Sequence, residues 1–152
     1  KTLEIVNQQL ISDTRADLFV SAFYGVWEPA SGMITFANAG HPPPFLFKSG
    51  DRAELIRQHG MVLGVMPEIN YVDQTLELAP GDLLVLYTDG VSEAQNSDQE
   101  LFGFQRLESL ILSETNWNAD AIAGAIVDRV VNFGGGRDFS DDLTTVTMRR
   151  IP

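Results

Sequence analysis

The first half of the chain consists of short runs of aromatic and β-branched residues separated by turn signals. Residues 18–27 and 33–38 flank the turn sequence 28–32, and residues 45–48 and 53–57 form a second pair. Such runs, closed by Gly, Pro, Ser and Asp, are typical of β-hairpins. The pattern predicts an antiparallel β arrangement for this half of the chain.

The strand pattern continues into the second half. Residues 71–78 alternate in the manner of a strand, with Val72, Leu76 and Leu78 expected to point inward. Residues 83–87 are apolar without a break, as in a central strand covered on both faces. Residues 143–148 predict a short final strand.

Helical periodicity marks three other segments. Residues 2–11, 104–113 and 119–133 each place apolar side chains on one face. Asn118 suits the N-cap of the last helix, and the glycines at 134–136 end it. Hairpins combined with packed helices indicate an α+β fold, with helices on an antiparallel sheet or sandwich, and a length of 152 residues favours one domain over 1–152.

Composition excludes several classes of function. Ten Lys and Arg against 21 Asp and Glu give a net charge of −11, which repels nucleic acid. No apolar stretch is long enough to cross a bilayer, so no membrane contact is expected. The chain has no cysteine, which excludes disulfides and thiolate metal sites, and we expect a cytoplasmic location. Surplus carboxylates either form a solvated surface or bind hard cations such as Mg²⁺ and Mn²⁺.

One acidic group directly follows the apolar run. Asp89 would be held at the end of a rigid strand, and Gly90, which has no Cβ, would let the main chain approach whatever the carboxylate binds. An oxygen-ligated metal suits this arrangement. Asp-Gly also forms type I′ hairpin turns, but residues 91–98 lack strand alternation. Glu93 either supports the site or is solvated.

A second acidic cluster, with Asp138, Asp141 and Asp142, precedes the last predicted strand. Neighbouring carboxylates repel one another unless water, a cation or a residue such as Arg137 offsets their charge. A divalent ion would do so, whereas an acidic surface loop is the simpler alternative.

Other common sites find no support. The two histidines, His41 and His59, lack the paired spacing of a zinc motif. His41 lies between Asn38 and a run of prolines, where we expect a structural hydrogen-bonding role. No Gly-x-Ser-x-Gly elbow presents a serine nucleophile.

Five strings in order resemble the SpoIIE/RsbU-type bacterial branch of the PPM (PP2C-like) serine/threonine phosphatases. They are LFVSAFYGV at 18–26, ANAGHPPP at 37–44, LGV at 63–65, PGDLLVLYTDGVSEA at 80–94 and DDLT at 141–144. The resemblance implies a sandwich of antiparallel sheets flanked by helices, with a dinuclear Mn²⁺ or Mg²⁺ centre. It makes Asp89 and Asp141 metal ligands and catalytic residues and includes Gly90 in the metal site, with Asp142 and Glu93 in support.

The implied activity is metal-dependent hydrolysis of phosphoserine or phosphothreonine on a regulatory protein of the anti-sigma-factor antagonist type. The family's first metal motif, Asp-x-x-Gly-x-Gly, is absent from residues 1–17, so the resemblance implies a domain lacking its N-terminal hairpin and first helix. We therefore expect residues 1–152 alone to be weakly active or inactive and to expose surface for self-association.

Two alternatives compete with this activity. A haloacid-dehalogenase-like mechanism fails because Tyr87 stands where its nucleophilic aspartate would be. The remaining alternative is a non-catalytic PP2C-like binding module in a partner-switching pathway.

Overall fold

The chain divides into two compact units, which are described separately. In this computed structural model the described residues are 1–13, 18–48, 52–113, 118–136 and 141–151. Unit 1 comprises Lys1–Pro43 and Arg57–Leu78, and unit 2 comprises Pro44–Ile56 and Ala79–Pro152. The chain therefore leaves unit 1 for a single hairpin of unit 2, returns, and then completes unit 2.

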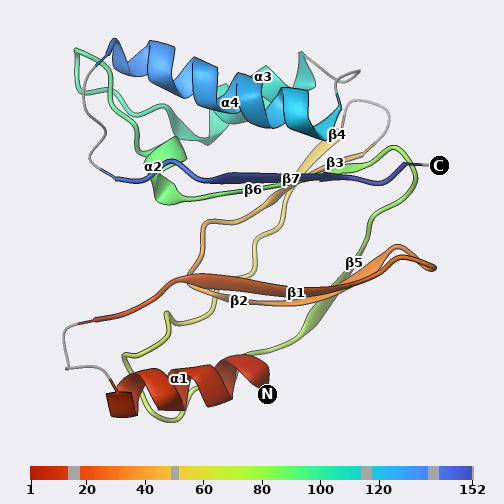
Figure 1. Ribbon diagram of the computed structural model, residues 1–152, viewed down its shortest axis with the longest axis vertical. Helices are drawn as coiled ribbons and strands as arrows, with labels where there is room; N and C mark the ends of the chain where they lie inside the picture. The colour runs from red at the N-terminus through yellow and green to blue at the C-terminus, as the bar shows by residue number, and fades with distance from the viewer. Residues whose placement is uncertain (14–17, 49–51, 114–117, 137–140, 152) are drawn as a thin grey trace. The chain divides into compact units, whose positions relative to one another are not determined.

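Unit 1 combines one helix with a three-stranded antiparallel sheet (Figure 1). Its elements are α1 (Thr2–Asp13), β1 (Ala22–Glu28), β2 (Met33–Ala39) and β5 (Gln74–Glu77), with the strand order β1-β2-β5. The β1–β2 pairing confirms the first predicted hairpin, although β1 begins later than the apolar run that starts at residue 18. A hydrogen-bonded bridge to Leu63 instead holds Val20.

The core of unit 1 lies between α1 and the sheet. Leu3 of α1 packs with Ala37 and Ala39 of β2, and Val6 and Leu10 continue the same helical face. The buried Asn7 satisfies both ends of its amide: Nδ2 donates to the Met66 carbonyl at 2.7 Å, and Oδ1 accepts from the Gly64 N–H at 2.8 Å. Because an unpaired buried amide is costly, this pair of bonds fixes α1 against the 63–66 loop.

The strand predicted at 71–78 is shorter than expected, and one inward residue is wrong. Strand β5 covers only Gln74–Glu77, where it pairs with β2. Leu76 and Leu78 are buried as predicted, whereas Val72 is 60% exposed. Val72 lies before the paired strand, so the sheet does not impose its two-residue alternation there.

Unit 2 is built on a four-stranded antiparallel sheet. Its strands are β3 (Phe45–Lys48), β4 (Arg52–Leu55), β6 (Leu83–Tyr87) and β7 (Thr145–Arg149), in the order β4-β3-β6-β7. Strand β6 lies between β3 and β7, and four of its five residues are buried. This confirms the prediction of a central strand from its unbroken apolar run.

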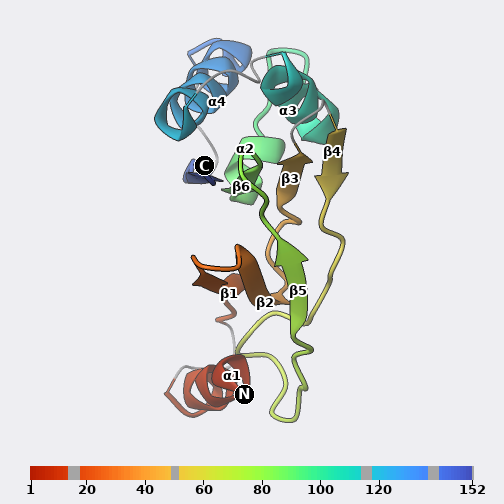
Figure 2. The ribbon, with the colours of Figure 1, turned by 90° about the vertical axis from the view of Figure 1, so that its right-hand side faces the viewer.

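Three helices complete unit 2: α2 (Asp89–Ser92), α3 (Gly103–Leu112) and α4 (Ala119–Gly134). Helices α3 and α4 cover one face of the sheet (Figure 2), where Leu107, Ile126 and Val130 pack into a core with Phe45, Val85 and Tyr87. Asn118 caps α4 by accepting from the Ala121 N–H at 2.8 Å, and Gly135 ends it at φ 65°. Both helix predictions and the α+β class are confirmed. No helix among the described residues is long and apolar enough to span a membrane.

Candidate metal centre

The first acidic group begins a helix at the end of the central strand. Strand β6 ends at Tyr87, Thr88 is extended with φ −81° and ψ 163°, and α2 starts at Asp89. The Val91 N–H donates to the Thr88 carbonyl at 3.0 Å and the Glu93 N–H donates to the Asp89 carbonyl at 2.7 Å. These bonds are helical, so the hairpin-turn alternative for Asp89-Gly90 is wrong.

Gly90 brings the second acidic segment directly against the first. A Cβ built on Gly90 would lie 2.5 Å from the Asp142 carbonyl oxygen and 3.4 Å from that of Asp141. No side chain fits in that space, because even a methyl group would overlap the main chain of 141–142. Because Gly90 has no Cβ, the main chain of 141–142 can pack directly against it. The sequence pattern alone predicts that this space serves whatever the Asp89 carboxylate binds.

Thr88 fastens the two segments together. Its hydroxyl donates to the Asp142 carbonyl at 2.9 Å and accepts from the Thr144 N–H at 3.1 Å. Its own N–H donates to the Thr144 carbonyl at 3.0 Å, extending the β6–β7 ladder by one residue. Sequence reasoning assigned no role to Thr88. The sequence feature that could have indicated this role is a hydroxyl residue directly before Asp89, at the end of the apolar run.

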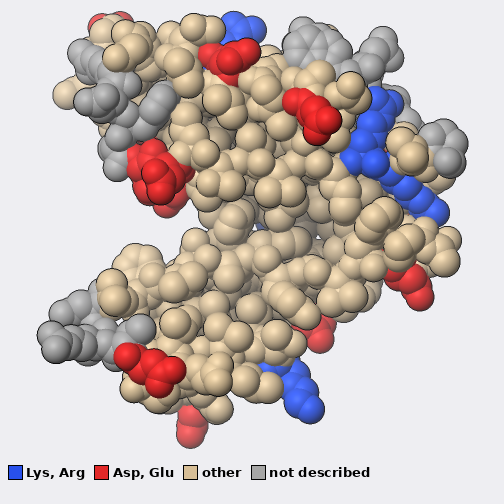
Figure 3. Space-filling view, in the orientation of Figure 1, with Lys and Arg blue, Asp and Glu red and all other residues tan. Residues whose placement is uncertain are grey.

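The carboxylates around this junction are exposed. Asp89, Glu93, Asp141 and Asp142 are all on the surface of unit 2, and Figure 3 shows acidic side chains gathered at its α2 end. Asp89 Oδ1 accepts from the Gly90 N–H at 3.0 Å, and Asp141 Oδ1 accepts from the Asp142 N–H at 2.7 Å. One carboxylate oxygen of each aspartate is thereby oriented by the backbone.

The carboxylates at this junction are the right type of ligand for a hard cation, but the described residues supply too few of them. Carboxylate oxygens are the ligands that Mg²⁺ and Mn²⁺ prefer, and Mg²⁺ takes six in near-octahedral geometry. Among the described residues, however, no group of three or more His, Asp or Glu side chains is close enough to hold an ion. Asp138 and Arg137 of the second predicted cluster lie outside the described residues. Any ion at this junction would need ligands beyond these side chains.

Behind the acidic junction, the sheet presents an aromatic wall. Tyr87, 1% exposed, stacks on Phe45 at 6.0 Å between ring centroids and meets Phe104 at 6.3 Å. Burial raises the pKa of the Tyr87 phenol well above its ordinary value. Strand β6, which leads to Asp89, therefore ends in a rigid, uncharged core residue.

His41 has the structural surroundings that its sequence context predicted. In unit 1, Asn38 Oδ1 accepts from the His41 N–H at 2.8 Å, and Asn38 Nδ2 donates to the His41 carbonyl at 2.9 Å. The ring Nδ1 lies 3.0 Å from the Pro42 carbonyl. These bonds close the corner after β2, as expected for a tightly turned segment.

Comparison with known proteins identifies the family. The chain matches the family model for Stage II sporulation protein E (SpoIIE) over residues 1–151. It is 28% identical to the phosphoserine phosphatase RsbU of Bacillus subtilis over 156 residues, covering 99% of this chain and 44% of RsbU. It spans less than half the length of the curated relatives it matches.

Solved structures show the same fold. The SiaA-PP2C domain of Pseudomonas aeruginosa superposes with a TM-score of 0.83 at 21% identity, covering 97% of this chain and 58% of that one. The structure of the PP2C phosphatase domain and a fragment of the regulatory domain of Bacillus subtilis SpoIIE gives 0.78 at 19% identity, covering 97% and 42%. The chain therefore has a PP2C-like phosphatase fold and belongs to the SpoIIE family.

Proposed function

We propose that this protein hydrolyses phosphoserine or phosphothreonine on a regulatory protein, with Asp89 and Asp141 as ligands of Mn²⁺ or Mg²⁺. The observation that carries the proposal is the approach of Gly90 to the main chain of 141–142, which brings two acidic segments 52 residues apart to one junction. The relative named phosphoserine phosphatase, RsbU, matches along almost the whole chain, which supports the reaction class.

The residues at the junction have separate roles in this proposal. Asp89 and Asp141 each keep one carboxylate oxygen fixed by a backbone N–H, so that the carboxylate presents a defined face to the cation. Gly90 sets the spacing of the two segments, and Thr88 locks it. Asp142 and Glu93 add negative charge nearby, which strengthens attraction of the ion without direct ligation.

When bound, the divalent ion would activate water and offset charge on the phosphoryl oxygens. The exposed position of the carboxylates suits a phosphorylated side chain on another protein, since a folded protein substrate can reach only sites at the surface. Because the described residues supply fewer ligands than a divalent ion requires, we expect weak turnover by residues 1–152 alone.

The regulatory setting extends the proposal. A phosphorylated anti-sigma-factor antagonist is the substrate class that the sequence resemblance implies, and a cytoplasmic location accompanies it. A solved relative from Mycobacterium tuberculosis is described as containing RsbU and RsbW domains, which supports a partner-switching context for this fold.

The decisive experiment measures metal binding through thermal stability. Mn²⁺ binding to the folded chain should raise the melting temperature, and a concentration of 100 times the dissociation constant corresponds to about 2.7 kcal/mol. Asp89→Asn and Asp141→Asn should each abolish the gain. Asp128→Asn, an equivalent change at an exposed position of α4, should retain it. Phosphate release from a phosphopeptide, measured with the same variants, links binding to hydrolysis.

The competing function is a PP2C-like module that binds proteins without catalysis. The absence of a three-residue ligand group among the described residues favours it. A module of that kind would melt at the same temperature with and without Mn²⁺, in the wild type as in Asp89→Asn. Equal Mn²⁺ responses in the wild type and in both Asp→Asn variants would also exclude Asp89 and Asp141 as ligands.

A further inference from the structure

A groove of about 910 Å³ opens between α3 and α4 of unit 2, away from the residues of the acidic junction. The two helices lie side by side (Figure 2), and each contributes one wall. The floor is apolar, since it includes Phe102 and Leu110, which are 1% and 8% exposed. The groove therefore offers an apolar base in a segment of the fold to which no role has been assigned.

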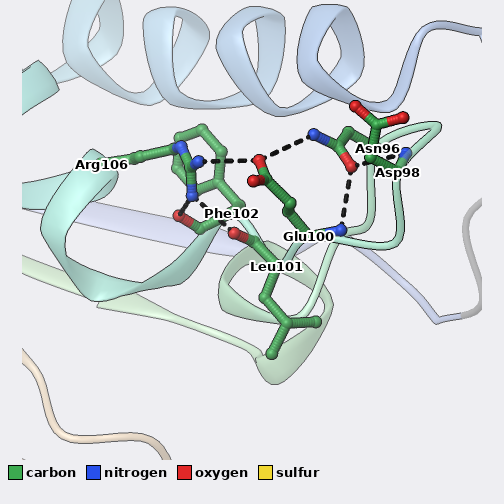
Figure 4. A network of polar contacts seen from close by, with 6 residues as sticks. All are labelled: Asn96, Asp98, Glu100, Leu101, Phe102 and Arg106. Carbon is green, nitrogen blue, oxygen red and sulfur yellow. Dashed lines mark hydrogen bonds and ion pairs between the residues drawn. The ribbon is translucent and has the colours of Figure 1, made fainter.

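The wall contributed by α3 is held rigidly by Arg106. Its guanidinium lies 4.9 Å from the centre of the Phe133 ring. It also donates to the Leu101 carbonyl at 2.7 Å and pairs with Glu100 at 3.2 Å (Figure 4). Phe133 in turn meets Phe102 edge-to-face at 5.4 Å. This stacking keeps the aromatic surface of the groove in place and reduces the cost of ordering it on binding.

The loop before α3 reinforces this arrangement. Asn96 Oδ1 accepts from the N–H groups of Asp98 and Glu100, both at 2.9 Å, and Asn96 Nδ2 donates to Glu100 at 3.1 Å (Figure 4). Glu100 is therefore fixed from one side by Asn96 and from the other by Arg106. The Glu100 carboxylate, which offsets part of the positive charge of Arg106, is thus held in place by these hydrogen bonds.

The opposite wall carries a cation for which the described part of the chain offers no partner. Arg129 of α4 is exposed and makes no ion pair or hydrogen bond to any other residue that the structure describes. Among the described residues that line the groove, Arg106 and Arg129 are charged and none is a carboxylate. The chain as a whole has a net charge of −11, whereas this groove combines positive charge with apolar surface.

We propose that this groove binds an acidic segment of a partner protein, with an apolar side chain of that segment against Phe133 and a carboxylate at Arg129. Charge complementarity identifies the occupant: the guanidinium of Arg129, with hydroxyls such as that of Ser109, matches a carboxylate, whereas Glu100 already pairs with Arg106. Phe104, Arg106 and Arg129 on the rim are exposed, so the groove cannot enclose a small molecule as a deep pocket would. It shares no residue with the acidic junction, so the inference does not depend on the phosphatase proposal.

The test uses the full chain labelled with ¹⁵N and a synthetic peptide in which a leucine and a phenylalanine are flanked by glutamates. We expect amide shifts at Ser109, Arg129 and Phe133, and affinity that falls with added salt. Replacing the glutamates by glutamine, or both apolar residues by alanine, should each weaken binding. Binding no weaker with either altered peptide would overturn the proposal.

Variants of the protein locate the contact. Arg129→Glu should weaken binding about five- to tenfold by removing an ion pair and adding repulsion, and Ser109→Glu should weaken it through repulsion alone. Arg57→Glu, the same charge reversal at an exposed position of unit 1, should have no effect. Unchanged affinity in both groove variants, or no binding at millimolar peptide, would refute the proposal. If inorganic phosphate caused equal amide shifts, the groove would be a simple anion site. If a groove variant changed the sedimentation behaviour, the occupant would be a second copy of the chain. Either outcome contradicts binding of a partner segment.

Discussion

Replacing Gly90 by alanine should force apart the two acidic segments. The added Cβ would lie 2.5 Å from the Asp142 carbonyl oxygen, about 0.9 Å closer than an ordinary contact, and 3.1 Å from the carbonyl carbon. Both neighbours are main-chain atoms, so no side-chain rotation relieves the overlap. Overpacking of this kind costs about 1–3 kcal/mol. Alanine recovers up to about 1 kcal/mol of helix propensity in α2, which leaves a net loss of about 0–3 kcal/mol.

A matched substitution separates the steric cost from the effect of removing a glycine. Gly124 lies in α4, and nothing lies within 4 Å of a Cβ built there. Gly124→Ala should therefore stabilise the chain by about 0.5–1 kcal/mol. Urea unfolding of both variants, followed by circular dichroism, measures the difference. If Gly90→Ala were as stable as Gly124→Ala, the close packing of the two acidic segments would be wrong.

Two further predictions concern the same end of β6. Thr88→Val keeps the shape of the side chain but removes the hydroxyl that bonds Asp142 and Thr144. The free energy of unfolding, measured in urea, should fall by about 1–2 kcal/mol. Thr88→Ser keeps the hydroxyl and should retain most of the wild-type stability. Because burial raises the pKa of Tyr87, its stabilising effect is complete below the ordinary tyrosine pKa of about 10 and is lost as pH rises above that value. Tyr87→Phe should therefore lose less stability than the wild type between pH 8 and pH 11, and equal losses would contradict the assignment.

Local patterns predicted most of the secondary structure because each pattern reflects contacts within a short stretch. The apolar run of β6, the helical faces of α3 and α4 and the cap at Asn118 all agree with the structure. The errors lie at strand ends. Val72 alternates like a strand residue but precedes the paired segment, and pairing depends on where a partner strand lies, which local alternation does not encode.

The metal-binding role of Asp89 and Asp141 stays a prediction, and the sequence anticipated only part of the geometry around them. Acidic residues directly after one strand and directly before another pointed to Asp89 and Asp141, and the residue pattern left the turn alternative for Asp89-Gly90 open. The helical bonds from Val91 and Glu93 decide that point. The function of Thr88 was not predicted, because the groups that its hydroxyl contacts are more than fifty residues away.

By itself the sequence determined the classes of element, the placement of carboxylates at strand ends and the family resemblance, all of which depend on residue order. Only the tertiary structure decided which segments meet: that β6 pairs with β7, that Gly90 accommodates the backbone of 141–142, and that Arg106 stacks on Phe133. The reason is physical, since contacts between distant segments depend on the shape and packing of the whole sheet and its helices, which no short window of residues contains.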